Sequence, residues 1–285
     1  MSALTISRKN ANRNPDYGLS DEYLAALGQS RYKGRDTDRR GPPFMTADPR
    51  SRIFVPLDTS DLETALRITR MLKGHVGGVK IGKEFFTALG PAGVARITDE
   101  GMPLFLDLKF HDIPNTVAGA VRSAVAMAPI ILNVHAGGGK AMMAAAANAA
   151  KEEAEKQGVP RPLVLGVTVL TSLDETDLAD TGVSGTAEDQ VLRLARLAGA
   201  AGLDGVVCSG AEIEPLRAAL GPGFKLLVPG IRPDWAAAGD QKRILTPSDA
   251  VARGADFLVI GRPITGADDP VAAAEKIGDE LANAA

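Results

Sequence analysis

From residue 52 onward, short apolar runs alternate with longer amphipathic segments that are rich in alanine. The runs have the length of β-strands and are apolar throughout, as is usual for parallel strands that helices cover. This alternation predicts a parallel sheet whose strands are connected by helices. The expected strands are Ile53–Leu57, Gly78–Ile81, Leu104–Leu108, Ile130–Val134, Leu163–Val169, Gly205–Cys208, Lys225–Val228 and Phe257–Ile260.

Eight strand–helix units over roughly 230 residues predict a closed (β/α)8 TIM barrel of the α/β class, which we expect over residues 51–285. An open doubly wound sheet is the alternative, but it normally has a glycine-rich turn after its first strand. Here the first strand is followed by Asp58-Thr59-Ser60-Asp61, which is typical of a helix cap. The expected helices are Asp61–Leu72, Pro91–Glu100, Thr116–Met127, Lys140–Gln157, Ala187–Ala200, Ala211–Leu220, Pro247–Arg253 and Pro270–Asn283.

Residues 1–50 differ in composition from the rest of the chain. They are rich in Asn, Arg, Asp, Ser and Gly, and only residues 21–27 have a helical pattern. We therefore expect residues 1–50 to form a poorly ordered N-terminal extension. The basic stretch at residues 31–40 leaves an anion-binding role open, although its composition favours a solvated tail.

Composition and charge exclude several classes of protein. No apolar run is long enough to span a membrane, and the N-terminus lacks the apolar core of a secretory signal. We therefore expect a cytoplasmic protein without a membrane partner. The net charge is −3, and residues 1–50 carry nine basic against six acidic residues, so the remainder is more acidic than the whole. An acidic body argues against nucleic acid as a partner.

The residues that most often bind metals are few. The single cysteine, Cys208, excludes a disulfide framework and a cysteine-rich zinc site. His111 and His135 are a possible metal pair, but no acidic ligands are suitably spaced around them. We expect packing or hydrogen-bonding roles for both histidines, and no metal site.

A cluster of charged residues follows the third expected strand. Asp107 and Lys109 are two positions apart, so their side chains lie on the same side of a strand, and Asp112 follows just beyond. A surface ion pair would need only one acid and one amine, and most such pairs contribute little to stability. The second acid favours a catalytic cluster over a solvated ion pair.

In a TIM barrel the active site lies at the C-terminal ends of the strands. The residues that close the expected strands therefore predict a ring around the site, with two lysines and three aspartates on one face. These residues are Asp58, Lys80, Asp107, Lys109, Asp112, His135, Thr171 and Ser172.

The ends of the last two strands have the composition of a phosphate site. Gly230 and Gly261 permit close backbone approach, and the loops after the seventh and eighth strands commonly bind phosphate. Arg232 and Arg262 can donate charge-assisted hydrogen bonds to a phosphate. The alternative is that each arginine caps a loop or pairs with a nearby aspartate.

The segment Asp107-Leu-Lys109-Phe-His-Asp112-Ile-Pro-Asn-Thr116 closely resembles the signature of orotidine 5'-phosphate decarboxylases. The resemblance covers residues 52 to about 283, and only the N-terminal extension lacks a counterpart in short bacterial members. Further matching motifs are Pro56-Leu57-Asp58, Val79-Lys80-Ile81-Gly82, Asn133-Val134-His135-Ala136, Leu170-Thr171-Ser172, Val228-Pro229-Gly230-Ile231-Arg232-Pro233, Asp240-Gln241-Lys242-Arg243 and Ile260-Gly261-Arg262-Pro263-Ile264.

The resemblance implies that the substrate is orotidine 5'-phosphate (OMP) and that the products are UMP and CO2. Lys109 resembles the general acid that protonates C6 of the pyrimidine, and Asp107 the acid that faces the substrate carboxylate. Lys80 and Asp112 complete the network, with Asp112 supplied by the neighbouring subunit of a homodimer with shared active sites, together with the residues up to Thr116. The implied substrate contacts are Asp58 and Lys80 to the ribose, Ser172 and Thr171 near the pyrimidine, and Gln241, Arg232 and Arg262 with Pro229, Gly230 and Gly261 around the phosphate.

The resemblance implies chemistry without a cofactor. Loss of CO2 leaves a carbanion at C6 without an adjacent carbonyl, and the usual electron sinks are pyridoxal phosphate or thiamine. A fixed ammonium group at C6 is the electrostatic alternative, and Lys109 can supply it. Two rival functions stay open, a metal-dependent sugar-phosphate decarboxylase or aldolase and a catalytically silent phosphate-binding barrel.

Overall fold

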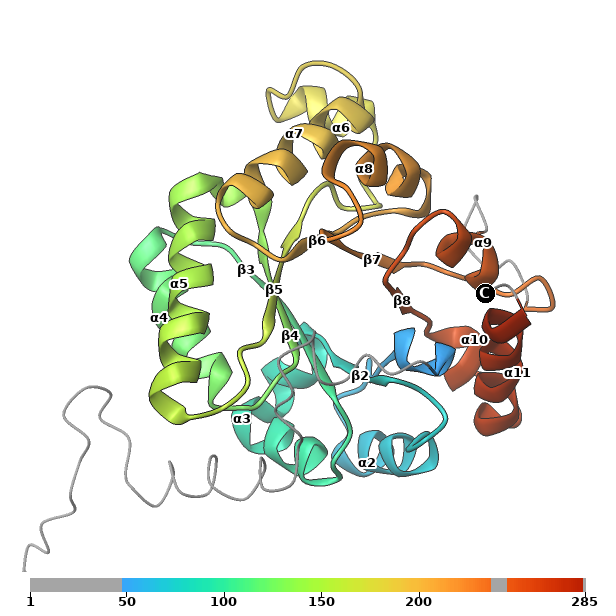
Figure 1. The fold of residues 1–285 in the computed structure, drawn as a ribbon. Helices are drawn as coiled ribbons and strands as arrows, with labels where there is room; N and C mark the ends of the chain where they lie inside the picture. The colour runs from blue at the N-terminus through green and yellow to red at the C-terminus, as the bar shows by residue number, and fades with distance from the viewer. Residues whose placement is uncertain (1–47, 237–244, 284–285) are drawn as a thin grey trace, which may run out of the picture.

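The computed structural model describes residues 48–236 and 245–283. Within them, eight parallel strands form a closed barrel in which each strand pairs with the next and the last pairs with the first. The predicted TIM barrel is therefore confirmed, with helices surrounding the strands (Figure 1). The strands are β1 (Ile53–Pro56), β2 (Gly78–Ile81), β3 (Leu104–Phe110), β4 (Ile131–His135), β5 (Leu163–Val167), β6 (Gly205–Val207), β7 (Lys225–Pro229) and β8 (Phe257–Val259).

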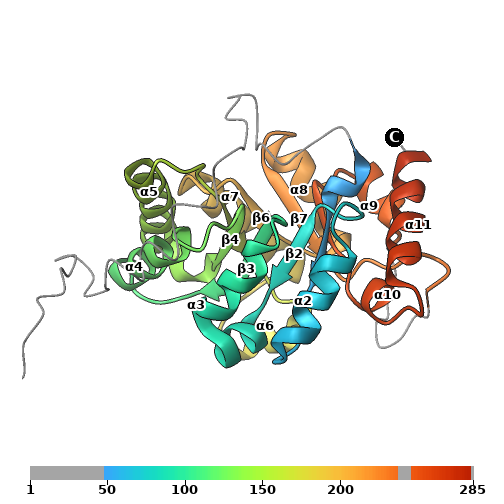
Figure 2. The ribbon, with the colours of Figure 1, turned by 90° about the horizontal axis from the view of Figure 1, so that it is seen from below.

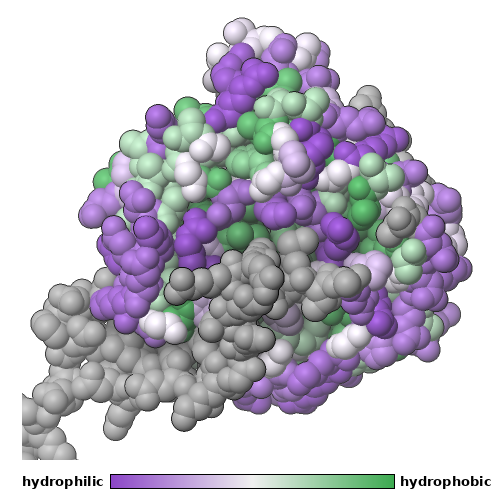
Figure 3. Space-filling model, viewed as in Figure 1, coloured by the Kyte–Doolittle hydropathy of each residue, from purple (hydrophilic) through white to green (hydrophobic). Residues whose placement is uncertain are grey.

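The helices form the outer layer. Helices α4 and α5 lie side by side, with α9, α10 and α11 on the opposite side of the barrel (Figures 1 and 2). Hydrophilic residues gather over α5 and α11 on the face shown in Figure 3. The helices are η1 (Pro49–Arg52), α2 (Leu62–Met71), α3 (Lys83–Asp99), α4 (Pro114–Val125), η2 (Ala136–Gly138), α5 (Gly139–Gln157), α6 (Glu175–Asp180), α7 (Ala187–Ala200), η3 (Gly210–Glu212), α8 (Ile213–Leu220), α9 (Pro247–Ala252), α10 (Arg262–Thr265) and α11 (Pro270–Asn283).

Helix α3 begins earlier than expected. The sequence predicted a helix only from Pro91, but the structure starts at Lys83 and continues across a kink at Gly90, where φ is 57°. Proline cannot donate the helical hydrogen bond and disturbs the preceding turn, so Gly90 and Pro91 interrupt the helix. The short helices α6 and α10 were not expected either. Helix α6 is capped by Asp174, whose side chain accepts hydrogen bonds from the Thr176 and Asp177 amides.

Large side chains fill the interior of the barrel below its mouth, toward the N-terminal ends of the strands. The Phe54 ring packs edge-on against the rings of Phe105 and Phe257, with centroid distances of 6.3 and 5.8 Å. Gly78 makes room for this packing, because a Cβ atom there would lie 2.7 Å from the Phe54 ring. Side chains alternate along each strand between the barrel interior and the helix layer. Polar residues that lie an even number of positions beyond these interior residues therefore also point inward, at the mouth of the barrel. The interior cluster is Phe54, Phe105, Ile131, Leu165, Leu227, Phe257 and Val259.

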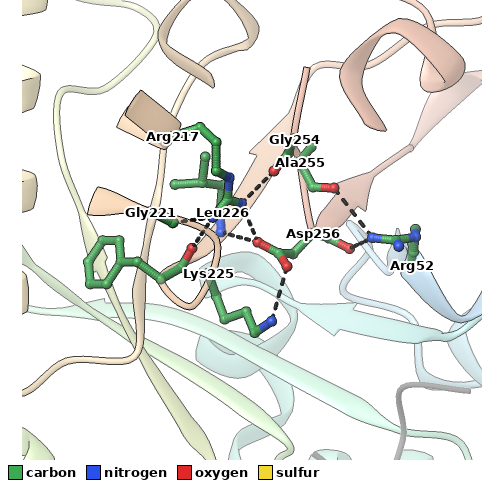
Figure 4. Close-up of polar contacts among 9 residues, drawn as sticks. Arg52, Arg217, Gly221, Lys225, Leu226, Gly254, Ala255 and Asp256 are labelled. Atoms are coloured by element: carbon green, nitrogen blue, oxygen red, sulfur yellow. Dashed lines mark hydrogen bonds and ion pairs between the residues drawn. The ribbon is translucent and has the colours of Figure 1, made fainter. Parts of the chain in front are cut away.

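An ionic network joins β7 and β8 at the N-terminal end of the barrel (Figure 4). Asp256 accepts hydrogen bonds from Arg217 Nη2 at 2.7 Å, from Lys225 Nζ at 3.1 Å and from the Leu226 amide at 2.9 Å. Arg52 donates to the carbonyl of Asp256 at 3.2 Å and thereby connects β1 to the network. This end of a barrel usually contributes stability and not catalysis.

A similar arrangement of a carboxylate, a strand amide and a basic side chain occurs between β5 and β6. Asp204 lies just before β6, as Asp256 lies just before β8, and its Oδ2 accepts the Val164 amide at 2.7 Å. Arg161 forms an ion pair with Asp204 at 2.8 Å. In both places a carboxylate satisfies a strand amide at the barrel end and neutralises a neighbouring cation.

Replacing Asp256 with alanine should lower the free energy of unfolding by about 3 kcal/mol, because it leaves largely buried cations without their partner. The side chains of Asp256, Arg217 and Lys225 are only 12, 20 and 22% exposed. Urea denaturation measures the effect, and the exposed acid Glu152, replaced by alanine, is the matched control with an expected change within about 0.5 kcal/mol. A loss for Asp256→Ala no larger than the control would contradict the role of the network.

The predicted N-terminal extension lies almost entirely outside the described residues. Its last three residues, 48–50, are described. Residues 49 and 50 belong to η1, which packs against α11, and the Arg50 side chain lies against Gly278. None of the helices in the described ranges is both long and apolar enough to cross a membrane.

Candidate active site

Three predicted residues form a continuous ionic chain at the C-terminal end of the barrel. Lys109 Nζ lies 2.6 Å from Asp107 Oδ1, and Lys80 Nζ lies 3.3 Å from Asp107 Oδ2. Lys80 also lies 3.4 Å from Asp58, which follows β1. Asp107 and Lys80 are each only 8% exposed, so their charges lie where water screens them poorly. The structure therefore brings Asp58, Lys80, Asp107 and Lys109 together as predicted.

The backbone of β3 is irregular at this cluster. Lys109 has φ of 52°, a left-handed conformation that residues other than glycine seldom adopt. The pairing with β4 also shifts here, since Leu106 pairs with Leu132 whereas Phe110 pairs with Val134. The sequence predicted that the strand ends at Leu108, but it continues through this bulge to Phe110. Bulges next to active sites redirect side chains, and this one turns Lys109 toward Asp107.

Asn133 is the residue that the sequence analysis missed. It lies on β4, is fully buried, and donates from Nδ2 to Asp107 Oδ1 at 2.7 Å. Its side-chain oxygen accepts the Lys109 amide at 2.8 Å. The only sequence signal was its position within the Asn133-Val134-His135-Ala136 motif, because the contact depends on how two strands pair.

Asp112 lies apart from the ionic chain. Its carboxylate accepts the Ile113 amide at 2.6 Å, and among the described residues no ion pair joins it to Lys80 or Lys109. Asp112, Ile113 and Thr116 are all exposed, with Ile113 at 66%. Within one chain the structure therefore does not bring Asp112 or Thr116 to the cluster.

A cavity of about 200 Å³ opens beside the cluster. One wall is charged and comes from β2 and β3, whereas the opposite wall comes from β5 to β8 and is mostly apolar. A small ligand in this cavity would touch the Lys109 amine while most of its surroundings exclude water. The lining residues are Lys80, Phe105, Asp107, Lys109, Val167, Val169, Leu170, Thr171, Val207, Cys208, Leu227, Pro229 and Val259.

Cys208 fits the role of a buried apolar side chain. It is 2% exposed, and burial raises the pKa of its thiol well above the usual range, so the thiol stays protonated at neutral pH. Ser172 is exposed in the turn after β5, beyond the neighbouring Thr171 that lines the cavity.

The predicted phosphate residues lie after β7 and β8. Gly230 has φ of 79°, and Gly261 lies against Pro56, since an added Cβ would be 3.1 Å from that ring. Arg262 is exposed and begins the short helix α10, whereas Arg232 is 6% exposed and its amide donates to the Leu245 carbonyl at 3.1 Å.

The loop after β7 is also anchored at Trp235, which is 40% exposed. The ammonium group of Lys276 on α11 lies 4.6 Å from the centroid of the Trp235 indole ring. Gln241, the remaining predicted phosphate contact, lies outside the described residues.

His111 and His135 lie side by side, with ring centroids 5.4 Å apart. Burial lowers the pKa of His135, and the positive charges of His111, Lys83 and Lys109 lower it further, so its imidazole is neutral at neutral pH. In the part of the chain that the structure describes, no group of three or more His, Cys, Asp or Glu side chains could hold a metal ion.

The fold and the site together define a TIM-barrel protein with a lysine–aspartate cluster at the mouth of a partly apolar cavity. The model of the orotidine 5'-phosphate decarboxylase / HUMPS family matches residues 51–277, and the chain belongs to this family.

Relatives and solved structures agree with this assignment. The chain is 55% identical to an orotidine 5'-phosphate decarboxylase of Rhodospirillum rubrum over 238 residues, which are 83% of this chain and 95% of the relative. It is 51% identical to the enzyme of that name from Moorella thermoacetica over 233 residues, 81% of this chain and 92% of the relative. The crystal structure of orotidine 5'-phosphate decarboxylase from Lactobacillus acidophilus aligns with a TM-score of 0.71 at 36% identity, covering 80% of this chain and 98% of that chain.

Proposed function

We propose that this protein catalyses the decarboxylation of OMP to UMP and CO2, the last step of de novo pyrimidine nucleotide synthesis. The observation that carries the proposal is the Lys80–Asp107–Lys109 chain beside a partly apolar cavity, in a member of this family. A fixed ammonium group in a site of low polarity stabilises negative charge far better than it would in water. Decarboxylation at C6 develops negative charge at one carbon, which is the task that such a group can perform.

We assign the central role to Lys109. Its ammonium stabilises the C6 carbanion as CO2 leaves and then transfers a proton to C6, which yields UMP. Asp107 holds Lys109 at 2.6 Å and faces the departing carboxylate, so the like charges separate as CO2 forms. Because both effects act mainly in the transition state, they raise kcat more than they tighten substrate binding. Neither step requires a metal ion or an organic cofactor.

The remaining residues hold the nucleotide. Asp58 and Lys80, which lie 3.4 Å apart at the edge of the cluster, are assigned to the ribose hydroxyls. Thr171 and Ser172 are assigned to the pyrimidine. The phosphate is assigned to the loops after β7 and β8, where a short extra helix commonly completes the phosphate site of a TIM barrel. Its ligands are Pro229, Gly230, Arg232, Gln241, Gly261 and Arg262.

We further propose a homodimer in which each chain completes the site of the other. Asp112 and Thr116 are exposed and lie beyond the end of β3, and the apolar side chain of Ile113 lies exposed between them. A two-fold interface through this segment would form two equivalent sites at once. The cytoplasmic location and the absence of nucleic-acid and membrane partners remain predictions.

Incubation of the purified full chain with OMP, with and without EDTA, tests the proposed function. We expect the absorbance of OMP to fall equally in both, with UMP as the product. Activity that EDTA abolishes and Mg²⁺ restores would favour the metal-dependent alternative. UMP binding without any turnover of OMP would favour a silent phosphate-binding barrel.

Replacing Arg262 with alanine should lower kcat/KM for OMP about ten- to a hundredfold, because the phosphate loses a charge-assisted hydrogen bond. The steady-state rate at low OMP concentration measures the effect, and Arg253→Ala, an exposed arginine at the end of α9, is the matched control. Phosphate assignment also predicts that the variant loses little activity on a substrate that lacks the phosphate. Equal losses on both substrates would contradict it.

A further inference from the structure

We propose that Asn133 is a positioning residue for the decarboxylation, one that holds the Asp107 carboxylate and the Lys109 main chain in their working geometry. The inference rests on the proposed function for its kinetic consequence, but its structural consequence can be measured without turnover. Asn133 itself is not placed to touch the reacting carbon.

The position of Asn133 makes a packing role insufficient as an explanation. It lies on β4 and is fully buried, and its strand neighbour on the same face, Ile131, belongs to the apolar interior cluster. A buried amide without partners would destabilise the fold, whereas an apolar side chain of similar size would extend the interior cluster at no such cost. The presence of an asparagine at this buried position is therefore explained by the groups to which its side-chain amide is hydrogen-bonded.

Both ends of the amide are used, and each binds a different part of the ionic chain. Nδ2 donates to Asp107 Oδ1 at 2.7 Å, and the side-chain oxygen accepts the Lys109 amide at 2.8 Å. These two partners fix the orientation of the Asn133 side chain, since the Asp107 carboxylate only accepts hydrogen bonds and the Lys109 main-chain N–H only donates. No other uncharged side chain of this size offers a donor and an acceptor with the same separation.

The Lys109 contact stabilises an irregular backbone. From Leu106 to Phe110 β3 advances by four positions, whereas β4 advances by only two, from Leu132 to Val134. Lys109 has φ of 52° inside this bulge, so its amide cannot follow the regular ladder, and Asn133 supplies the acceptor instead. Unusual backbone conformations of this kind persist only where the surroundings hold them.

The Asp107 contact fixes the direction of the carboxylate. Oδ1 accepts from Asn133 Nδ2 at 2.7 Å and from Lys109 Nζ at 2.6 Å, while Oδ2 faces Lys80 Nζ at 3.3 Å. All three residues lie on strands, but each lysine ammonium is at the end of a long flexible side chain, whereas the Asn133 amide is one carbon from the backbone. Asn133 is thus the rigid member that sets where Asp107 can place Lys109.

Asn133→Ala should lower kcat for OMP about ten- to a hundredfold and change the affinity for UMP by less than about threefold. The reason is that the lost contacts position the proton donor and not the nucleotide. The Lys109 amide should also exchange its hydrogen faster, as mass spectrometry of the peptide that contains it can show. Thr69→Ala is the matched control, because it removes another fully buried polar group, which lies on α2 and is bonded to the Ala65 carbonyl at 2.7 Å.

Asn133→Asp separates positioning from a general structural role. This variant keeps the volume and the acceptor for the Lys109 amide, so hydrogen exchange there should stay slow. When the new carboxyl is ionised it repels Asp107, and when it is protonated it can donate to Asp107 as the amide does. Burial and the neighbouring acid raise the pKa of the introduced carboxyl.

The ratio of variant to wild-type kcat should therefore rise about threefold or more as the pH falls from about 8 to about 5.5. Lys109 on β3 and Lys80 on β2 oppose this protonation, and the other charged or titratable groups around this part of the barrel mouth are His135, His111, Lys83 and Asp58. A raised pKa also makes the folded variant less stable as the pH rises, so circular dichroism at each pH has to show that the variant stays folded. Asn148→Asp, the same substitution at an exposed position of α5, should give a flat ratio.

Two results would overturn the inference. One is an Asn133→Asp ratio that stays flat or falls at low pH in a folded variant. The other is slow exchange at the Lys109 amide in Asn133→Ala, which would show that Asn133 does not hold the bulge. If the wild-type protein forms no UMP, the proposed function fails, and the exchange experiment still decides whether Asn133 positions Lys109.

Discussion

Replacement of Lys109 with alanine should lower kcat for OMP by at least about a thousandfold. An electrostatic donor at the site of developing charge contributes about a hundred- to a thousandfold, and general acid catalysis contributes on a similar scale. Lys109 performs both tasks in the proposed mechanism, and in the structure its ammonium lies 2.6 Å from Asp107 at the cavity wall. Steady-state kinetics with OMP measures the loss.

Binding of UMP should survive in Lys109→Ala, within a few fold of the wild type, because the product carries no charge at C6. Isothermal titration with UMP provides this second measurement. Lys151→Ala is the matched control, since Lys151 is an exposed lysine of α5 that is far along the chain from the cluster. A Lys109→Ala protein that retains a tenth of the wild-type kcat would remove Lys109 from the central role.

Mixing two inactive variants should restore activity if the sites are shared between chains. In a dimer of one Lys109→Ala chain and one Asp112→Ala chain, one site contains both lesions and the other contains neither. Random exchange of equal amounts should therefore recover about a quarter of the wild-type activity, since about half of the dimers are mixed and each has one intact site. The activity of the mixture after subunit exchange measures this.

The structural reason for the expectation is the position of Asp112. It is exposed, it does not pair with Lys80 or Lys109 within its chain, and it precedes an isoleucine that is 66% exposed. The control is a mixture of Lys109→Ala with Lys80→Ala chains. In their mixed dimers each of the two sites keeps one lesion, so activity should not return. If mixed dimers form but no activity returns, Asp112 acts within its own chain.

Much of the barrel could be predicted from local sequence patterns, because its strands are apolar on both faces and amphipathic segments separate them. These patterns alone indicate the strand β2 (Gly78–Ile81) and the helix α7 (Ala187–Ala200) with their observed bounds. The convergence of Lys80, Asp107 and Lys109 could also be predicted, since strand parity decides which side chains reach the barrel mouth. These features depend on short-range patterns that the sequence displays directly.

The features that escaped prediction depend on contacts between segments far apart in the chain. The sequence shows charged residues after Leu108 and predicts the end of a strand, but β3 continues to Phe110 because Asn133 of the neighbouring strand accepts the Lys109 amide. The same holds for Arg232, whose burial depends on how the loop after β7 folds back toward Leu245. Neither could be read from local spacing.

The central claim is that the fixed charges of this site stabilise a carbanion at C6 and that Lys109 exchanges a proton with it. By microscopic reversibility, the same site should remove the C6 proton of UMP, so incubation of UMP in D2O should introduce deuterium at C6. Proton NMR should show loss of the C6–H signal with the wild-type protein at the same rate with or without EDTA, and no loss above background with Lys109→Ala. Exchange that is equally fast with Lys109→Ala would contradict the proposed role of Lys109.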